Sequence, residues 1–137
     1  MKENQAFYDT RRDETYAHEV SCDRPTERLQ YPMLKNFIER HALGEKRCLE
    51  IGSGIGVFQD MVPDYTGTDI SESLGRFYHK PYFVVRPDGT YPFEDGSFDA
   101  LWTITVFEHI PESDLALREM TRVLKRGGVV LFAPAWE

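Results

Sequence analysis

Short apolar runs alternate along this chain with segments in which apolar residues recur at helical spacing. The runs predict strands at residues 47–51, 65–69, 82–85, 98–104 and 129–133. Helical spacing or a capping residue predicts helices at residues 33–44, 57–61, 71–78 and 112–125, the last one closed by Gly127 and Gly128. Strands separated by helices favour βαβ units, which build a parallel sheet with helices on both faces. The expected fold class is therefore α/β.

The first 32 residues follow a weaker pattern than the rest. Residues 5–20 are mostly polar and charged with sparse apolar positions, which predicts an amphipathic helix or an ordered arm. Residues 22–32 contain two prolines and predict a linker. We therefore expect a helical arm and linker over residues 1–32, followed by one α/β domain over residues 33–137.

The first predicted strand of this domain ends in an acidic residue followed by three glycines at alternate positions. The segment reads Cys48-Leu-Glu-Ile-Gly-Ser-Gly-Ile-Gly56. Glycines in a strand–turn–helix unit let backbone N–H groups approach a ligand. The dinucleotide fingerprint G-x-G-x-x-G is not met, because Val57 occupies the place of its third glycine. Glu50 places a carboxylate under the loop, which suits a ligand with positive charge or hydroxyl donors better than a pyrophosphate.

Composition and charge narrow the classes of partner. The formal net charge is −7 and no run of lysines or arginines occurs, which argues against a nucleic-acid partner. No stretch of 18 apolar residues predicts a membrane span. Neither cysteine has a second ligand at metal-binding spacing, so we expect no metal site. Residues 1–5 lack the apolar core of a signal peptide, and we expect a cytoplasmic location.

Four sequence blocks in order resemble the class I S-adenosylmethionine-dependent methyltransferases. The blocks are Glu50-Ile-Gly-Ser-Gly-Ile-Gly56, Gly67-Thr-Asp-Ile-Ser71, Pro92-Phe-Glu-Asp-Gly-Ser-Phe-Asp99, and Glu108-His-Ile110 with Leu117-Arg-Glu-Met-Thr-Arg-Val-Leu-Lys-Arg-Gly-Gly128. The resemblance spans residues 34–134. It implies a Rossmann-like sheet, S-adenosylmethionine as the cofactor, and methylation of a small molecule at O, N or C. The Asn-Pro-Pro-aromatic signature of amino-methylating DNA enzymes is missing, because residues 103–106 read Thr-Ile-Thr-Val.

The resemblance also implies which residues hold the cofactor at the carboxyl ends of the strands. Glu50 would reach its amino-acid end, directly or through water, and Asp69 would accept hydrogen bonds from the ribose hydroxyls. Ile70 would pack on one face of the adenine, while Asp88 with Gly89 would meet the adenine amino group. The remaining residues of the expected site are Gly52, Ser53, Gly54, Gly56, Thr103 and Ile104, of which the last two would contact the methionine portion through backbone groups.

Each assignment has a structural alternative. Asp69 could be a solvated helix cap, Asp88 a turn residue, and Glu50 a buried carboxylate without a ligand. His109 is a candidate general base, because imidazole titrates near neutral pH, but the matching histidine usually packs or lines the pocket.

The sequence stops soon after the fifth predicted strand, whereas relatives normally continue into two further strands. We therefore expect a fragment that lacks strands six and seven, with an exposed apolar edge at residues 129–132 through which it could form a homo-oligomer. Two other functions stay open. One is a different Rossmann-like enzyme, such as a nicotinamide-dependent reductase, and the other is a non-catalytic cofactor-binding or scaffolding domain.

Overall fold

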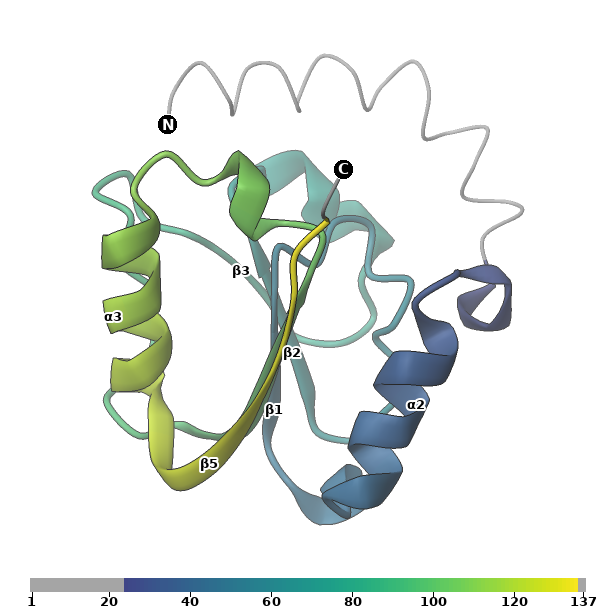
Figure 1. Ribbon diagram of the computed structural model, residues 1–137. Coiled ribbons are helices and arrows are strands. Elements are labelled where there is room, and N and C mark those ends of the chain that lie inside the picture. The colour runs from purple at the N-terminus through teal and green to yellow at the C-terminus, as the bar shows by residue number, and fades with distance from the viewer. Residues whose placement is uncertain (1–23, 136–137) are drawn as a thin grey trace.

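Within residues 24–135, which this computed structural model describes, five parallel strands form one sheet in the order β3-β2-β1-β4-β5 (Figure 1). The strands are β1 (Cys48–Ile51), β2 (Tyr65–Asp69), β3 (Tyr82–Val84), β4 (Phe98–Ile104) and β5 (Leu124–Ala133). The predicted fold class, a Rossmann-like α/β sheet, is confirmed. Most of the predicted N-terminal arm, residues 1–23, lies outside the described residues.

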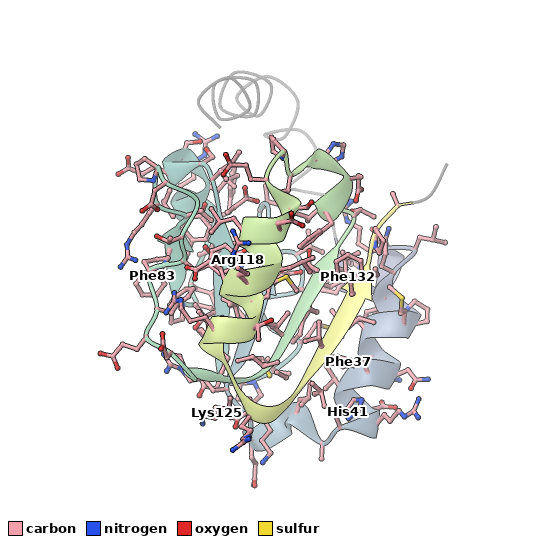
Figure 2. All side chains as sticks on the ribbon, turned by 60° about the vertical axis from the view of Figure 1, so that its left-hand side comes forward. Phe37, His41, Phe83, Arg118, Lys125 and Phe132 are labelled. Atoms are coloured by element: carbon pink, nitrogen blue, oxygen red, sulfur yellow. The ribbon has the colours of Figure 1, made fainter. Side chains whose placement is uncertain are left out.

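Within the described part of the chain, two α-helices cover opposite faces of the sheet (Figure 1). Helix α2 (Tyr31–Arg40) buries Leu34 and Phe37, and helix α3 (Ser113–Val123) buries Met120 among others. Four short 3-10 helices join the elements: η1 (Pro25–Glu27), η2 (Leu43–Glu45), η3 (Glu72–Phe77) and η4 (Phe107–His109). In Figure 2 the exposed rings of Phe83 and Phe132 mark the two edges of the sheet, while α3 crosses in front of it.

Alternation along β1 assigns its side chains to two separate cores. Cys48 belongs to a cluster with Tyr65 and Trp102 on the α2 side, and Leu49 belongs to a cluster with Leu101 on the α3 side. Successive side chains of a strand point to opposite faces, and a parallel sheet is buried on both. This alternation puts Glu50 on the α2 side of the sheet and Ile51 on the α3 side.

The strand order positions a crevice at the centre of the sheet. The chain runs from β1 outward through β2 to β3, and then returns to the other side of β1 for β4 and β5. Glu50 on β1 is therefore paired with Gly67 of β2 and Trp102 of β4. In open α/β sheets, ligands bind beyond the carboxyl ends of the strands where the order reverses, which here lies between β1 and β4.

The helix predicted over residues 57–61 is wrong. This segment forms consecutive turns, in which Gln59 N–H bonds Gly56 O at 3.0 Å and Met61 N–H bonds Phe58 O at 3.0 Å. The Gln59 side chain donates to Phe77 O at 3.0 Å and accepts from His79 N–H at 3.0 Å. These contacts with the segment after η3 hold the turns in place, and no spacing pattern encodes them.

The predicted closure of the last helix by Gly127 and Gly128 is also wrong. Helix α3 ends at Val123, and β5 begins at the next residue. A Cβ atom on Gly128 would lie 2.6 Å from Leu124 Cγ and 2.9 Å from Asp99 O. Gly128 is therefore needed for the close approach of β5 to β4, near an irregularity in their register at Phe98.

Candidate cofactor site

A pocket of about 570 Å³ opens at the carboxyl ends of the central strands. Its volume lies within the range of about 300–1,000 Å³ that is typical of small-molecule sites. The structure brings together, along its walls, the predicted residues Gly52, Gly54, Asp69, Ile70, Asp88, Gly89, Ile104 and His109. Four predicted residues do not line it: Glu50, Ser53, Gly56 and Thr103.

The glycine loop after β1 uses its glycines for two different reasons. Gly52 and Gly54 have φ angles of 69° and 56°, in the left-handed region that favours glycine. A Cβ atom on Gly52 would lie 2.3 Å from Val106 Cγ2, so Gly52 lets the loop approach the segment after β4. A Cβ atom on Gly54 would meet no atom within 4 Å. Because Gly54 also lines the pocket, the space beside it is open to a ligand.

Asp69 anchors the glycine loop to the end of β2. Its Oδ2 accepts a hydrogen bond from Gly54 N–H at 2.9 Å, and its Oδ1 accepts one from Ile70 N–H at 2.7 Å. The residue is 9% exposed and lines the pocket. The carboxylate therefore holds the loop and faces the ligand space at the same time, which a solvated helix cap would not do.

Glu50 lies under the loop, on the α2 side of the sheet. It is 4% exposed, and its Oε1 accepts a hydrogen bond from the Tyr65 hydroxyl at 2.6 Å. Burial raises the pKa of Glu50 to about 7, and the hydrogen bond from Tyr65 opposes this rise. Glu50 thus supports the loop from beneath instead of forming a wall of the pocket.

A second tyrosine completes this support. The Tyr78 hydroxyl lies 2.6 Å from Ser53 Oγ and 2.8 Å from Gly54 O. A Cβ atom on Gly56 or on Gly67 would lie 2.8 Å from Tyr78 Cε1. Gly56 therefore makes room for the Tyr78 ring, and its contact with the ligand stays a prediction. The sequence analysis missed both tyrosines, because each comes from a different strand or loop.

Asp88 and Gly89 form a turn at the rim of the pocket. Asp88 Oδ1 accepts hydrogen bonds from Thr90 N–H at 3.0 Å and from the Thr90 hydroxyl at 2.7 Å, and these bonds lower the pKa of the exposed Asp88 carboxyl. Gly89 has a φ angle of 87°. The two alternatives raised by the sequence are therefore compatible, because the turn itself lines the pocket.

The segment after β4 forms the opposite wall. Thr103 is buried below the surface, and its Oγ1 has no hydrogen-bond partner among the described residues. Thr105 has a φ angle of 53°, which is uncommon for a residue other than glycine and is typical of functional sites. His109 lines the pocket, but its side chain is 60% exposed and its Nε2 lies 3.8 Å from Glu108 Oε1.

Sequence reasoning missed a further part of the wall. These further lining residues come from β1, the loop after β3, the connection into α3 and α3 itself: Ile51, Val85, Pro87, Tyr91, Thr105, Val106, Ile110, Pro111, Glu112, Leu115 and Ala116. The connection crosses above β4, so its apolar residues face the ligand space although they belong to no strand end. The apolar Ile110-Pro111 before the last helix was the available signal.

The sequence matches the methyltransferase domain family over residues 49–132. The chain belongs to this family. It is 27% identical over 116 residues to a ubiquinone biosynthesis O-methyltransferase of Chromobacterium violaceum, covering 74% of this chain and 50% of that protein. It is 39% identical over 132 residues to a 2-methyl-6-phytyl-1,4-hydroquinone methyltransferase of Synechocystis, covering 74% of this chain and 41% of that protein. The chain thus spans about half the length of these curated relatives, or less.

A solved structure supports the fold of this methyltransferase domain independently. A SAM-dependent methyltransferase from Thermotoga maritima superposes with a TM-score of 0.64 and 21% identity, covering 92% of this chain and 59% of that chain. At this identity the likeness concerns the fold alone. The family match and the sheet order together confirm the predicted class I, Rossmann-like S-adenosylmethionine-dependent methyltransferase.

Residues 24–135 lack two further features. In this range no three or more His, Cys, Asp or Glu side chains gather in a way that could hold a metal ion. None of the helices in the same range has the length and apolar character needed to cross a membrane.

Proposed function

We propose that this domain binds S-adenosylmethionine and directs its methyl group to a small-molecule acceptor at O, N or C. The observation that carries the proposal is the anchored glycine loop. Asp69 holds Gly54 N–H at 2.9 Å at the edge of a pocket, and the space beside Gly54 is open. The family of the chain supports the same activity.

The pocket residues fit the parts of this cofactor. The carboxylate of Asp69 would accept hydrogen bonds from the ribose hydroxyls, and Ile70 would lie against the adenine. Asp88 and Gly89 at the rim would receive the adenine amino group. The backbone of Thr103 and Ile104 would meet the methionine portion, with Gly52 and Gly54 beside it. Because Glu50 faces away from the pocket, its contribution to the amino-acid end would pass through the loop or a water molecule.

The reaction needs alignment more than acid–base chemistry. When bound, S-adenosylmethionine supplies an electrophilic methyl carbon on a positively charged sulfur. The residues around the pocket would hold the acceptor beside the cofactor in a fixed orientation and exclude water from both. Val106, Ile110, Pro111 and Leu115 provide the apolar wall that keeps water out. His109 at the rim would accept a proton from an O–H or N–H acceptor.

The net charge and the pocket wall favour one class of acceptor. A net charge of −7 supports a small-molecule acceptor over a nucleic acid. The apolar wall supports an acceptor with an apolar body, and two curated relatives are named for ubiquinone biosynthesis and for methylation of a hydroquinone. The cytoplasmic location, the domain boundary at residue 33 and association through β5 remain predictions.

Calorimetry with S-adenosylmethionine, S-adenosylhomocysteine and NAD tests the proposal. We expect the folded protein to bind both sulfur ligands and not NAD. Binding of NAD alone would favour the nicotinamide-dependent alternative and contradict the proposal. Binding of the sulfur ligands, with no methyl transfer to quinols, phenols or amines, would favour the non-catalytic alternative.

A further inference from the structure

Tyr91 is a phenol placed inside an apolar wall. It is 3% exposed and belongs to the cluster on the α3 side of the sheet, with Leu49, Ile51 and Leu101. It also lines the pocket, together with Asp88 and Gly89 at the rim. An apolar side chain would satisfy the packing at this position, so the hydroxyl requires a separate explanation.

The Tyr91 hydroxyl has no hydrogen-bond partner among the described residues. Other tyrosine hydroxyls near the site do have one: Tyr65 bonds Glu50, Tyr78 bonds Ser53, and Tyr82 bonds Ser71 O. Thr103 Oγ1 also has no partner in this part of the chain, but that atom is completely buried, whereas the Tyr91 oxygen is not. Tyr91 is almost fully buried and lines the pocket, so the pocket is the space from which a ligand could reach its hydroxyl.

The backbone of Tyr91 is held on both sides. Its N–H donates to Glu119 Oε1 at 2.8 Å, and its carbonyl accepts from Arg122 Nη2 at 3.0 Å. Arg122 also pairs with Glu119, with Nε 2.6 Å from Oε2. Arg86 Nη1 adds a second hydrogen bond to the same Tyr91 carbonyl at 3.4 Å. Helix α3 therefore fixes the backbone from which the phenol projects, and a preset side chain loses little freedom when a ligand arrives.

The proton of this hydroxyl is available for donation. Burial, and secondarily the charge of Glu119, raise the pKa of Tyr91 above its ordinary range. Tyr91 is therefore a neutral donor at physiological pH and cannot serve as a general base. In the ligand-free protein this donor has no partner within the described residues and can bond only water, and a ligand acceptor would take the place of that water with a modest net gain.

We propose that the Tyr91 hydroxyl donates a hydrogen bond to a ring nitrogen of the adenine of the cofactor. This inference rests on the proposed function. Adenine presents acceptor nitrogens on its ring and a donor in its amino group. Asp88 supplies an acceptor and Tyr91 a donor on walls of the same pocket, which matches both kinds of group. Tyr91 is thus a specificity-determining residue of the adenine end.

Tyr91→Phe removes only the hydroxyl and tests this assignment. Calorimetry should show S-adenosylhomocysteine affinity about tenfold weaker than in the wild type, as expected for one recovered buried donor. The 1-deaza, 3-deaza and 7-deaza analogues of the ligand should identify the nitrogen. The wild type should lose affinity for one analogue, whereas Tyr91→Phe should bind that analogue and the parent ligand equally. Tyr31→Phe on α2, across the sheet, is the matched control and should retain wild-type affinity.

Thermal unfolding without ligand separates recognition from structure. The Tyr91 hydroxyl has no partner to lose, so Tyr91→Phe should have the wild-type Tm or a higher one. Unchanged affinity in Tyr91→Phe, or a lowered Tm with equal losses for every analogue, would overturn the assignment. A wild type that binds no sulfur ligand would instead overturn the proposed function.

Discussion

The two sides of β1 differ in how the tyrosine hydroxyls near the pocket are bonded. On the α2 side, Glu50, Tyr65, Ser53 and Tyr78 have hydrogen-bond partners within the protein, directly under the glycine loop. On the α3 side, Tyr91 lines the pocket and its hydroxyl has no hydrogen-bond partner among the described residues. A satisfied buried network rigidifies its surroundings, whereas an unsatisfied donor is free to recognise a ligand. The comparison assigns support to one side and recognition to the other.

The largest expected effect on ligand binding comes from Gly54, in the loop between the hydrogen-bonded network and the pocket. Gly54→Val should weaken S-adenosylhomocysteine binding on the order of a hundredfold or more, because the side chain fills the ligand space and φ is 56°. Gly96→Val is the matched control, since Gly96 has a φ of 62°, has no atom within 4 Å of its Cβ position and lies outside the pocket. Both variants should lose stability, but calorimetry should show lost binding only in Gly54→Val. Equal binding by the two would contradict the placement of the ligand.

The buried carboxylate of Glu50 should make the stability of the protein depend on pH. Its folded pKa is raised from 4.5 to about 7, so the folded state binds the proton more tightly than the unfolded state. Stability from this group is complete below about pH 4.5 and is lost as the pH rises to about 7, on the order of 1–3 kcal/mol. Urea unfolding should show this loss in the wild type and not in Glu50→Gln. The exposed Glu45→Gln should keep the wild-type profile. A wild-type profile in Glu50→Gln would exclude a raised pKa at this residue.

Asp69 combines the two roles, because it anchors the glycine loop and also lines the pocket. Asp69→Ala should cost about 1.5–3 kcal/mol of binding free energy, which is roughly ten- to a hundredfold in Kd. Asp60→Ala removes an exposed carboxylate 2.6 Å from His79 Nε2 and should change Kd little. Unchanged affinity in a folded Asp69→Ala would show that Asp69 acts only as an anchor of the loop.

The smallest expected effect contrasts two tyrosines. Tyr78→Phe deletes a hydroxyl that contacts Ser53 and Gly54, and should lower the free energy of unfolding by about 1–2 kcal/mol. Its affinity for S-adenosylhomocysteine should fall less than that of Tyr91→Phe, which should keep its stability. Urea unfolding and calorimetry on both variants measure the contrast. The same pattern of losses in both would remove the distinction between support and recognition.

Much of the fold could be predicted because its signals are local. Strands β2 and β4 have the predicted bounds, since short apolar runs between turn residues predict buried strands. The helix prediction for residues 57–61 was wrong because hydrogen bonds between Gln59 and the chain near Phe77 and His79 hold this segment in turns. The predicted end of α3 was wrong because Gly128 allows β5 to approach β4 closely, and in the sequence this glycine looks like a helix cap.

In the candidate site, too, some residues could be predicted from the sequence and others could not. Gly52, Gly54, Asp69 and Asp88 were predictable because each follows a strand end, and all such ends meet at one edge of a parallel sheet. The hydrogen bond between Glu50 and the Tyr65 hydroxyl could not be predicted, because the family resemblance implied a role for Glu50 but not this partner. Tyr91 was missed because its orientation depends on Glu119, 28 residues away along the chain.

The sequence by itself determined the order of strands and helices, the glycine loop, and the acidic residues at the strand ends. These features depend on neighbours within a few residues, through periodicity, turn propensity and glycine backbone freedom. Tertiary structure alone decided that the Glu50 carboxylate bonds the Tyr65 hydroxyl, that Tyr78 occupies the room left by Gly56 and Gly67, and that Tyr91 lines the pocket. The physical reason is that hydrogen bonds and close packing join segments distant in the chain, and no local pattern records which partner each polar group will find.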